Sequence, residues 1–402
     1  MSSGILVLNA GSSSIKFSLY IDGEGAPPVL SCKGQIDGIN VDPHFVARCV
    51  GREGEIDRRW GKSVPFTELL SDMLDWIEGH LGYATLGIAG HRVVHGGRNY
   101  AAPLLIDDDV MTELHRLIPL APLHEPFALE VISATRRLYP DLPQVACFDT
   151  AFHRNNDRLA TLFALPRELI DAGVIRYGFH GLSYEFIAHR LRELSPETAK
   201  GKVIVCHLGS GASMCAIDNG RSVCSTMGFT ALDGLPMGTR TGSLDCGVLL
   251  YLMQEKGMDV NEVQRLLYHK SGLLGLSGIS NDMRLLVGND HPHAKEAVDY
   301  FVYRVGRELG SLAAAMGGVD AVVFTAGIGE HSPEIRSRVL KENSWLGLAV
   351  DEDANKKVKE GLISPAGTRC PAWVIPTDEE LMIARRTAEF LVQSKKGFSE
   401  TR

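Results

Sequence analysis

Short apolar runs alternate with amphipathic segments along the whole chain. Runs rich in Val, Ile, Leu and Phe, which predict strands, occur near residues 5–8, 15–20, 88–94, 144–148, 203–206, 214–217, 320–325 and 372–375. Apolar residues recur at helical spacing over 68–81 and 298–316, and the stretch 378–392 is also amphipathic and helical. Strands mixed with helices in this order predict an α/β chain.

The pattern at the start of the chain occurs again in its middle. Residues 5–20 read ILVLNAGSSSIKFSLY and residues 203–217 read VIVCHLGSGASMCAI, so that Asn9 aligns with His207. A third strand-to-glycine junction lies in DAVVFTAGIGEHS, residues 320–332. This repetition predicts a duplicated fold whose glycine loops face one cleft.

The length fits two domains, because 402 residues exceed one ordinary domain. Since the second copy of the pattern begins near residue 203, we place the boundary near residue 150. We expect an N-terminal domain at 1–150 and a C-terminal domain at 151–380. A final helix at 381–402 is expected to pack back on the first domain.

Composition and charge narrow the class of protein. The net charge is −8, with 41 basic against 49 acidic residues and no basic block, which disfavours nucleic acid as a partner. No apolar run approaches 18 residues and no leader pattern opens the chain, so neither a membrane nor secretion is expected. Eight cysteines without a C-x-x-C pair, several inside apolar strands, predict reduced core thiols rather than disulfides or zinc ligands. We therefore expect a cytoplasmic globular protein.

Glycine loops in an α/β protein suggest phosphate binding, because backbone N–H groups can converge on an anion. The GKS sequence at 61–63 is not a Walker A motif, since Ile56 occupies the position of its first glycine. The stretches GSGASM and GIGEHS lack the last glycine of the dinucleotide fingerprint, and the protein-kinase motifs are absent from the sequence. What remains is a phosphate cradle made of tight turns between strands.

Charged and polar residues gather where apolar strands end. They are Arg92, His124, Asp149, His180, Arg240, Glu379 and Glu380. Each residue also has a purely structural explanation. An Arg often forms an ion pair at the surface, a His beside a Gly is often a turn residue, and a Glu in the first turn of a helix interacts favourably with the helix dipole. Together they supply the cations, the carboxylate for Mg²⁺ and the glycine cradle that phosphoryl transfer needs.

A series of motifs covers the chain from end to end. They are LVLNAGSSSIKFSLY, GHRVVHGG, PLAPLH, CFDTAFH, YGFHG, HLGSGAS, MGFTALDGLPMGTRTGSLD, FTAGIGEHSPEIR and IPTDEELMIAR. In order and spacing the series resembles the acetate kinase (acetokinase) family of the acetate and sugar kinase/actin superfamily. The resemblance implies a duplicated actin-like, ribonuclease H-like fold, with two domains around a nucleotide cleft, and a homodimer. It also implies reversible, direct in-line transfer of the ATP γ-phosphoryl group to acetate, giving acetyl phosphate and ADP, with Mg²⁺ or alternatively Mn²⁺.

The same resemblance assigns roles to individual residues. The catalytic residues would be Arg92, Asp149, His180 and Arg240. Asp149 corresponds to the catalytic acid of the family, but a metal-orienting role fits the chemistry better than proton transfer, because acetate is already ionised at pH 7. Acetate, and alternatively propionate, would be bound by Arg92, Val94, Leu123, His124, Phe179 and Ala231. ATP would contact Lys16, His207, Leu208, Gly209, Ser210, Gly211, Asp282, Met283, Arg284, Gly327, Ile328, Gly329, Glu330 and His331. The metal would be held by Asn9 and Glu379.

The chain departs from the usual family motifs at five places. HLGNG is here HLGSG with Ser210, GIGEN is GIGEH with His331, HGTSH is HGLSY with Leu182 and Tyr184, LHNP is LHEP with Glu125, and FTPLEGL is FTALDGL with Ala231. None of these changes removes an Arg, the site His or the metal carboxylate. They bear on the nucleotide contacts and on the preferred acyl chain.

Two alternatives stay open. One is a sibling kinase that prefers propionate or butyrate, or that uses another phosphoryl donor such as pyrophosphate. The other is a non-catalytic, actin-like nucleotide-binding scaffold, which would have no need of Arg92, His180 and Arg240 together.

Overall fold

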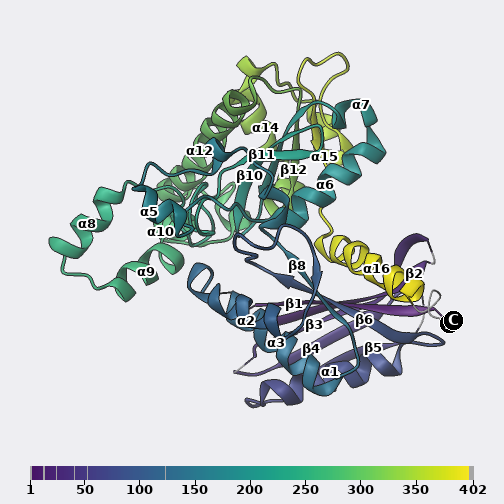
Figure 1. Ribbon diagram of the computed structural model, residues 1–402. Helices are drawn as coiled ribbons and strands as arrows, with labels where there is room; N and C mark the ends of the chain where they lie inside the picture. The colour runs from purple at the N-terminus through teal and green to yellow at the C-terminus, as the bar shows by residue number, and fades with distance from the viewer. Residues whose placement is uncertain are drawn as a thin grey trace. The chain divides into compact units, whose positions relative to one another are not determined.

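The computed structural model describes residues 2–11, 14–23, 25–39, 41–51, 53–122 and 124–397, with side chains as far as residue 391. It divides into two compact units, one formed by Met1–Ala151 with Asp378–Arg402 and the other by Phe152–Thr377. Each unit contains one mixed sheet with helices packed against it (Figure 1). Among the residues described, no helix is both long and apolar enough to cross a membrane.

The first unit holds an eight-stranded sheet. Its strands are β1 Ser3–Ala10, β2 Ser14–Gly23, β3 Ala26–Asp37, β4 His44–Cys49, β5 Glu55–Arg59, β6 Thr85–Val93, β7 Leu104–Leu105 and β8 Gln144–Phe148. They lie in the order β5-β4-β3-β2-β1-β6-β8-β7, with β1, β6 and β8 parallel. Its helices are α1 Phe66–Gly79, α2 Asp108–Arg116, α3 Glu125–Leu138 and α16 Glu379–Gly397, with the 3₁₀ helix η1 Ile118–Leu120.

The apolar face of α1 builds the core of the first unit together with the first strands. The buried residues of this face are Leu69, Leu70, Met73, Leu74 and Ile77, at the helical spacing seen in the sequence. They share one cluster with side chains of β1, β2 and β3. Burying a side chain of this size contributes about 1.5–3 kcal/mol, so this face fixes α1 on the sheet.

The second unit holds a six-stranded sheet. Its strands are β9 Lys202–Leu208, β10 Ala212–Asp218, β11 Arg221–Ser225, β12 Ala321–Thr325, β13 Gly361–Leu362 and β14 Ala372–Val374, in the order β11-β10-β9-β12-β14-β13. Its helices are α4 Arg158–Thr161, α5 Arg167–Asp171, α6 Gly181–Leu194, α7 Pro196–Ala199, α8 Cys246–Gln254, α9 Val260–His269, α10 Gly272–Ser277, α11 Met283–Leu286, α12 Pro292–Met316, α13 Ala326–His331, α14 Pro333–Glu342 and α15 Glu352–Lys357. The remaining 3₁₀ helices described are η2 Ala151–His153 and η3 Ser344–Leu346.

The two sheets share one topology. The order β3-β2-β1-β6-β8 of the first corresponds to β11-β10-β9-β12-β14 of the second, with antiparallel pairs followed by parallel pairs in both. At aligned positions of the two hairpins, Asn9 lies opposite Lys16 and His207 lies opposite Ser213. The structure confirms the α/β class and the duplication predicted from the repeated strand–glycine–strand pattern.

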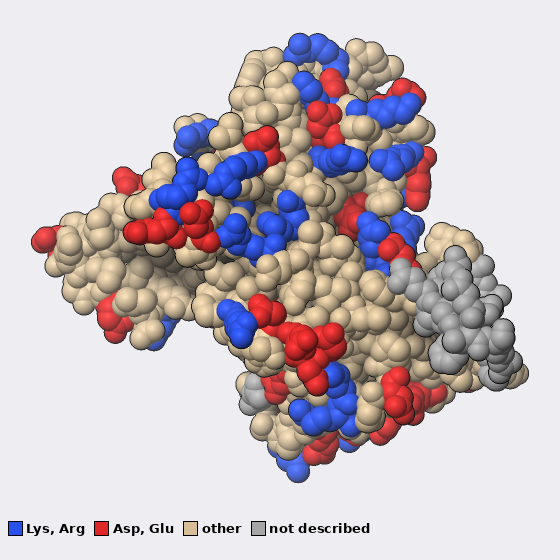
Figure 2. Space-filling model, in the orientation of Figure 1, with Lys and Arg blue, Asp and Glu red and all other residues tan. Residues whose placement is uncertain are grey.

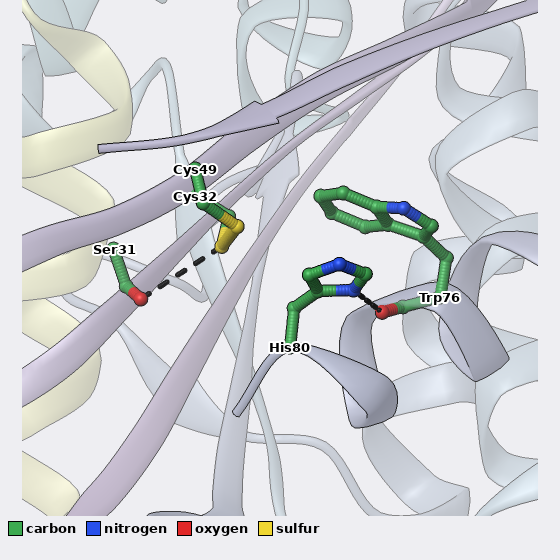
Figure 3. The surroundings of a disulfide bond; sticks show 5 residues. All are labelled: Ser31, Cys32, Cys49, Trp76 and His80. Carbon is green, nitrogen blue, oxygen red and sulfur yellow. Dashed lines mark hydrogen bonds between the residues drawn. A yellow bond between two sulfur atoms is a disulfide. The ribbon is translucent and has the colours of Figure 1, made fainter. Parts of the chain in front are cut away.

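Cys32 in β3 and Cys49 in β4 form a disulfide (Figure 3). The two residues are directly opposite each other in the antiparallel pair, with Cα atoms 3.9 Å apart. The prediction that all eight cysteines are reduced thiols is therefore wrong for this pair. The apolar pattern does not predict β3 or β4, so the 17-residue separation gives no sign that the cysteines meet. The six free cysteines are Cys147, Cys206, Cys215, Cys224, Cys246 and Cys370.

Candidate active site

Two side chains from neighbouring strand ends meet in the first unit. Because β6 and β8 run parallel, residues at their carboxyl ends lie at the same edge of the sheet. Arg92 is next to last in β6, and Asp149 directly follows β8. Nε of Arg92 lies 3.2 and 3.1 Å from the two carboxylate oxygens of Asp149, and Nη2 lies 2.7 Å from Oδ2. This bidentate contact fixes the plane of the guanidinium.

A second carboxylate lies beside the same guanidinium. Glu379, the first residue of α16, places Oε2 3.5 Å from Nη1 of Arg92. Burial lowers the pKa of Arg92, but the charges of Asp149 and Glu379 outweigh it, so the pKa is raised overall. Burial raises the pKa of Asp149, while Arg92 opposes this effect and Glu379 adds to it. Arg92 thus remains a cation shared by two carboxylates.

Three consecutive carboxylates, Asp378, Glu379 and Glu380, lie at the start of α16. Burial raises the pKa of Glu380, and the charges of Glu379 and Asp378 raise it further against a smaller opposing effect of Lys16. A divalent cation would relieve this repulsion. Within the described ranges, no group of three or more His, Cys, Asp or Glu residues could hold a metal by itself. The side chains of Asn9 and Glu379 nevertheless offer oxygen atoms, the ligand type that hard divalent cations prefer.

Asn9 and Lys16 lie on the hairpin of β1 and β2 as direct cross-strand partners. Directly opposite side chains of an antiparallel pair point to the same face, so the amide and the ammonium group share one face of the sheet. The loop between the strands contains Ser12 and Ser13, which lie outside the described residues.

The predicted acyl-binding residues of the first unit follow β6 or precede α3. Val94 is buried directly after β6, and His124 is the N-cap residue of α3. The charge of His124 acts to lower the pKa of Asp149, which indicates that the imidazole lies near this carboxylate. Leu123 lies outside the described residues.

Glu125, the first residue of α3, is fully buried, although sequence reasoning gives it no role. Its Oε2 accepts a hydrogen bond from the His95 N–H at 3.2 Å, and Oε1 has no hydrogen-bond partner among the described residues. Burial raises the pKa of Glu125 to about 8, with a further upward contribution from Asp149. The departure from LHNP marks the position, but nothing in the sequence indicates that the carboxyl is buried.

A cavity of about 1090 Å³ lies in the second unit between the β9–β10 turn and the helices α11, α13, α14 and α15. Eight residues predicted to contact ATP line it: Gly209, Ser210, Asp282, Met283, Arg284, Gly327, Ile328 and His331. The predicted residues His207, Leu208, Gly211, Gly329 and Glu330 are not among its lining residues. Lining residues that the sequence does not single out are Asn281, Val287, Ser332, Pro333, Glu334, Ser337, Arg338, Lys341, Glu352 and Lys356.

Glu330 binds backbone groups next to this cavity. Its Oε1 accepts hydrogen bonds from the N–H groups of Ala326 at 2.7 Å and of Thr377 at 3.1 Å. Ala326 has φ 63°, a left-handed conformation that costs a non-glycine residue about 1–2 kcal/mol. Glu330 therefore stabilises the turn that leads from β12 into α13.

Arg336 in α14 supports the same turn from the protein interior and is almost fully buried. Its Nη1 donates to the carbonyl oxygens of Gly329 and Glu330, both at 2.8 Å, and its Nε donates to Oδ1 of Asn355 at 2.7 Å. Burial lowers the pKa of Arg336 to about 10. A cation at the carbonyl end of α13 offsets the partial negative charge there, so Arg336 fixes the position of the cavity wall.

Two predicted catalytic residues flank Gly211 in the β9–β10 turn. A Cβ atom placed on Gly211 would lie 3.5 Å from Nε2 of His180 and 3.7 Å from Nη2 of Arg240. Nη1 of Arg240 donates to the carbonyl oxygen of Ala231 at 2.9 Å. His180 has φ 57° and is the N-cap residue of α6. Phe179, predicted to contact the acyl group, is buried directly before it.

Comparison with known proteins decides the family. The model of the acetokinase family matches residues 4–385. This chain belongs to the acetokinase family. It is 52% identical over 390 residues to the acetate kinase of Rhodopseudomonas palustris (strain ATCC BAA-98 / CGA009), which covers 96% of this chain and 98% of that one. It is 49% identical over 385 residues to the acetate kinase of Rhizobium meliloti, covering 95% and 97%.

Solved structures of the acetokinase type have the same fold. Porphyromonas gingivalis acetate kinase gives a TM-score of 0.87 at 34% identity, covering 97% of this chain and 100% of that one. A propionate kinase from Francisella tularensis gives 0.88 at 35% identity, covering 96% and 99%. The predicted family, the kinase class and the duplicated actin-like fold are confirmed.

Proposed function

We propose that this chain catalyses the acetate kinase reaction, the reversible transfer of the γ-phosphoryl group of ATP to acetate. The observation that carries the proposal is the pair of side chains, His180 and Arg240, beside Gly211 in a glycine turn. This turn adjoins a cavity large enough for a nucleotide. Family membership supports the same reaction.

The reaction needs no general base. A carboxylic acid with a pKa near that of Glu, about 4.3, is already ionised at pH 7. An acetate oxygen attacks the γ-phosphorus and forms the new O–P bond, while the bond from this phosphorus to the β–γ bridging oxygen breaks and ADP leaves with the electron pair. The chain then has to position the reactants and neutralise the charge on the phosphoryl oxygens.

The described contacts support a division of roles. Arg92, held by Asp149, would bind the substrate carboxylate, and Arg240, held by the Ala231 carbonyl, would bind the phosphoryl oxygens. His180 would donate a hydrogen bond to the same oxygens. Asn9 and Glu379 would hold a divalent metal, for which we propose Mg²⁺ with Mn²⁺ as the alternative. When bound, such an ion neutralises phosphate charge.

A hydroxamate assay tests the proposed reaction and its alternatives together. Hydroxylamine traps the acyl phosphate formed from the donor and the carboxylate. We expect product from ATP and acetate. Product formed with pyrophosphate but not with ATP would indicate a pyrophosphate-dependent sibling kinase. Product formed with butyrate but not with acetate would indicate a kinase for longer acyl chains. Nucleotide binding without any trapped product would show a scaffold.

Propionate is expected to react with kcat/KM within about tenfold of acetate, a difference of about 1.4 kcal/mol or less. Ala231 stands where the family motif FTPLEGL has Pro, so one wall of the acyl pocket lacks a ring. Burying one more methylene contributes about 0.8 kcal/mol, whereas a pocket that excludes it imposes about 1–3 kcal/mol. The Ala231 carbonyl binds Arg240, so this wall lies beside a proposed catalytic group.

Measuring kcat/KM for acetate, propionate and butyrate checks this expectation. Ala231→Pro restores the ring and keeps the carbonyl, so it should widen the preference for acetate. Ala231→Ser, close to alanine in size, is the matched control and should leave the ratio unchanged. Rejection of propionate by a hundredfold or more in the native enzyme would show that Ala231 does not open the pocket.

We also propose a homodimer formed through α8. This helix reads CGVLLYLMQ and has no buried residue, with Leu250 57% and Tyr251 49% exposed. The surface over α8 is mainly tan in Figure 2, without the charges of an ordinary solvent-facing helix. A helix with none of its apolar side chains buried usually belongs to an interaction surface. The family resemblance implies that a second copy of this chain binds there.

Analytical ultracentrifugation should show a dimer for the native chain. Leu250→Asp should dissociate this dimer, whereas Glu130→Gln on α3 should leave it intact. A monomeric native chain would contradict the proposal.

The two compact units are proposed to be the two actin-like domains, with α16 part of the first. A cytoplasmic location is proposed from the six free cysteines. The Cys32–Cys49 disulfide counts against it, because disulfides are rare in that compartment.

A further inference from the structure

The His180 imidazole is held by a chain of hydroxyl groups inside the second unit. Its Nδ1 lies 2.8 Å from Oγ of Ser213 in β10, and that oxygen lies 2.5 Å from the hydroxyl of Tyr184 in α6. Ser213 and Tyr184 are both fully buried. The side of His180 that bears Nδ1 therefore faces the protein, and Nε2 lies beside Gly211.

A second imidazole is held in the same way. Nδ1 of His207 lies 2.8 Å from Oγ of Ser183, which lies 2.9 Å from Oγ1 of Thr377. The rings of His180 and His207 stack with centroids 4.2 Å apart and planes 16° apart. Protonation of both rings would place two positive charges in contact, with Arg240 beside Gly211 as a third. Like charges at such distances disfavour the charged form, so the arrangement suits neutral imidazoles.

A neutral imidazole carries its proton on only one nitrogen, and its hydrogen-bond partner decides which one. A phenol is a stronger donor than an alkyl hydroxyl, because its pKa is near 10 and its oxygen lone pair is delocalised into the ring. In a chain of Tyr184, Ser213 and His180, the favoured order is donation from the phenol to Ser213 and from Ser213 to Nδ1. This order leaves the proton on Nε2.

We propose that Tyr184 and Ser213 are positioning residues that fix His180 as the Nε2–H tautomer, so that a neutral imidazole presents a donor at the glycine turn. The inference rests on the proposed function of His180 as a donor to the transferring phosphoryl group. It also gives a role to Tyr184, which stands where the usual family motif HGTSH has a second His.

The ¹⁵N spectrum of histidine-labelled protein tests the tautomer directly, since protonated and unprotonated ring nitrogens give distinct signals. The His180 signals are identified by their loss in His180→Gln. In the native chain we expect Nε2 protonated and Nδ1 unprotonated. Ser213→Ala and Tyr184→Phe should each increase the Nδ1–H form, with the larger change in Ser213→Ala.

Kinetics give a second, independent measurement. Each single variant should lower kcat for acetyl phosphate formation by about tenfold or less and leave the KM for ATP within twofold. Because both side chains act through one hydrogen-bonded chain, the double variant should be no slower than Ser213→Ala alone. Tyr177→Phe is the matched control: this buried hydroxyl donates to the Gly173 carbonyl at 2.8 Å, and its loss should not change the His180 tautomer.

A native His180 protonated on Nδ1, or a tautomer unchanged in both single variants, would overturn the relay. If Tyr184→Phe fails to fold, Ser213→Ala alone decides, because it removes only one oxygen atom. The spectrum does not depend on turnover. A chain with the Nε2–H tautomer that makes no acetyl phosphate would therefore contradict the proposed function and leave the relay intact. An active enzyme with the Nδ1–H tautomer would contradict the relay and leave the proposed function intact.

Discussion

Arg240→Ala is expected to lower kcat for acetyl phosphate formation by about 100-fold or more while the fold survives. Removing one donor that acts on charge developing in a transition state costs about 10²–10³ in kcat. Arg240 lies beside Gly211, and the Ala231 carbonyl orients its guanidinium, so this charge is fixed before the substrates bind. The KM for ATP should change less than kcat, because the phosphoryl charge spreads most in the transition state.

Two further variants make the Arg240 test specific. Arg240→Lys keeps the charge but loses the planar fork, so it should restore activity only in part. Arg221→Ala removes an exposed arginine of β11 in the same unit and should leave kcat unchanged. Circular dichroism and thermal unfolding establish that each variant is folded. An Arg240→Ala enzyme within threefold of the native kcat would remove Arg240 from the catalytic set.

The sequence predicts the strands that bury both faces and the helices with one apolar stripe. β1, β8, β9 and β12 are nearly continuous runs of buried apolar residues, and α1 has its apolar residues at helical spacing. The apolar pattern does not predict the outer strands β4 and β5, because many of their residues are polar and face solvent. It does not predict the disulfide between Cys32 and Cys49 either, because this bond depends on the pairing of β3 with β4.

The candidate site divides along similar lines. Arg92 and Asp149 could be named as site residues from the sequence because each lies near the end of an apolar run. Their ion pair follows from the parallel pairing of β6 and β8, which brings these ends together. The roles of Arg336 and Glu125 could not be predicted from the sequence. Charged residues are usually exposed, and no sequence pattern distinguishes a buried one. Arg336 is buried among carbonyl oxygens and Glu125 beside one backbone N–H group, and such contacts exist only after the chain has folded.

Glu125→Gln is expected to remove a large pH dependence of stability. Burial raises the pKa of Glu125 to about 8 from 4.5, so between these values the folded chain holds a proton that the unfolded chain has lost. The contribution of Glu125 to the free energy of unfolding therefore falls as pH rises from about 4.5 through about 8, and this contribution levels off above that range. Over pH 5 to 8 this single carboxyl accounts for a loss of about 3 kcal/mol, at about 1.4 kcal/mol per unit of pKa. Gln is close to the neutral carboxyl in shape and does not titrate.

Denaturant unfolding of the native chain and of Glu125→Gln at pH 5, 6.5 and 8 measures the effect. The variant should gain stability relative to the native chain as pH rises, with the largest difference at pH 8. Both chains contain the other titratable groups, Asp149 included. Their contributions to the pH dependence therefore cancel in the difference between the two free energies of unfolding. Glu130→Gln, at an exposed position of the same helix α3, is the matched control and should follow the native curve. The contrary result is a difference in the free energy of unfolding between Glu125→Gln and the native chain that stays constant from pH 5 to 8. It would show that Glu125 is already ionised in the folded state, although its carboxyl group is buried beside His95.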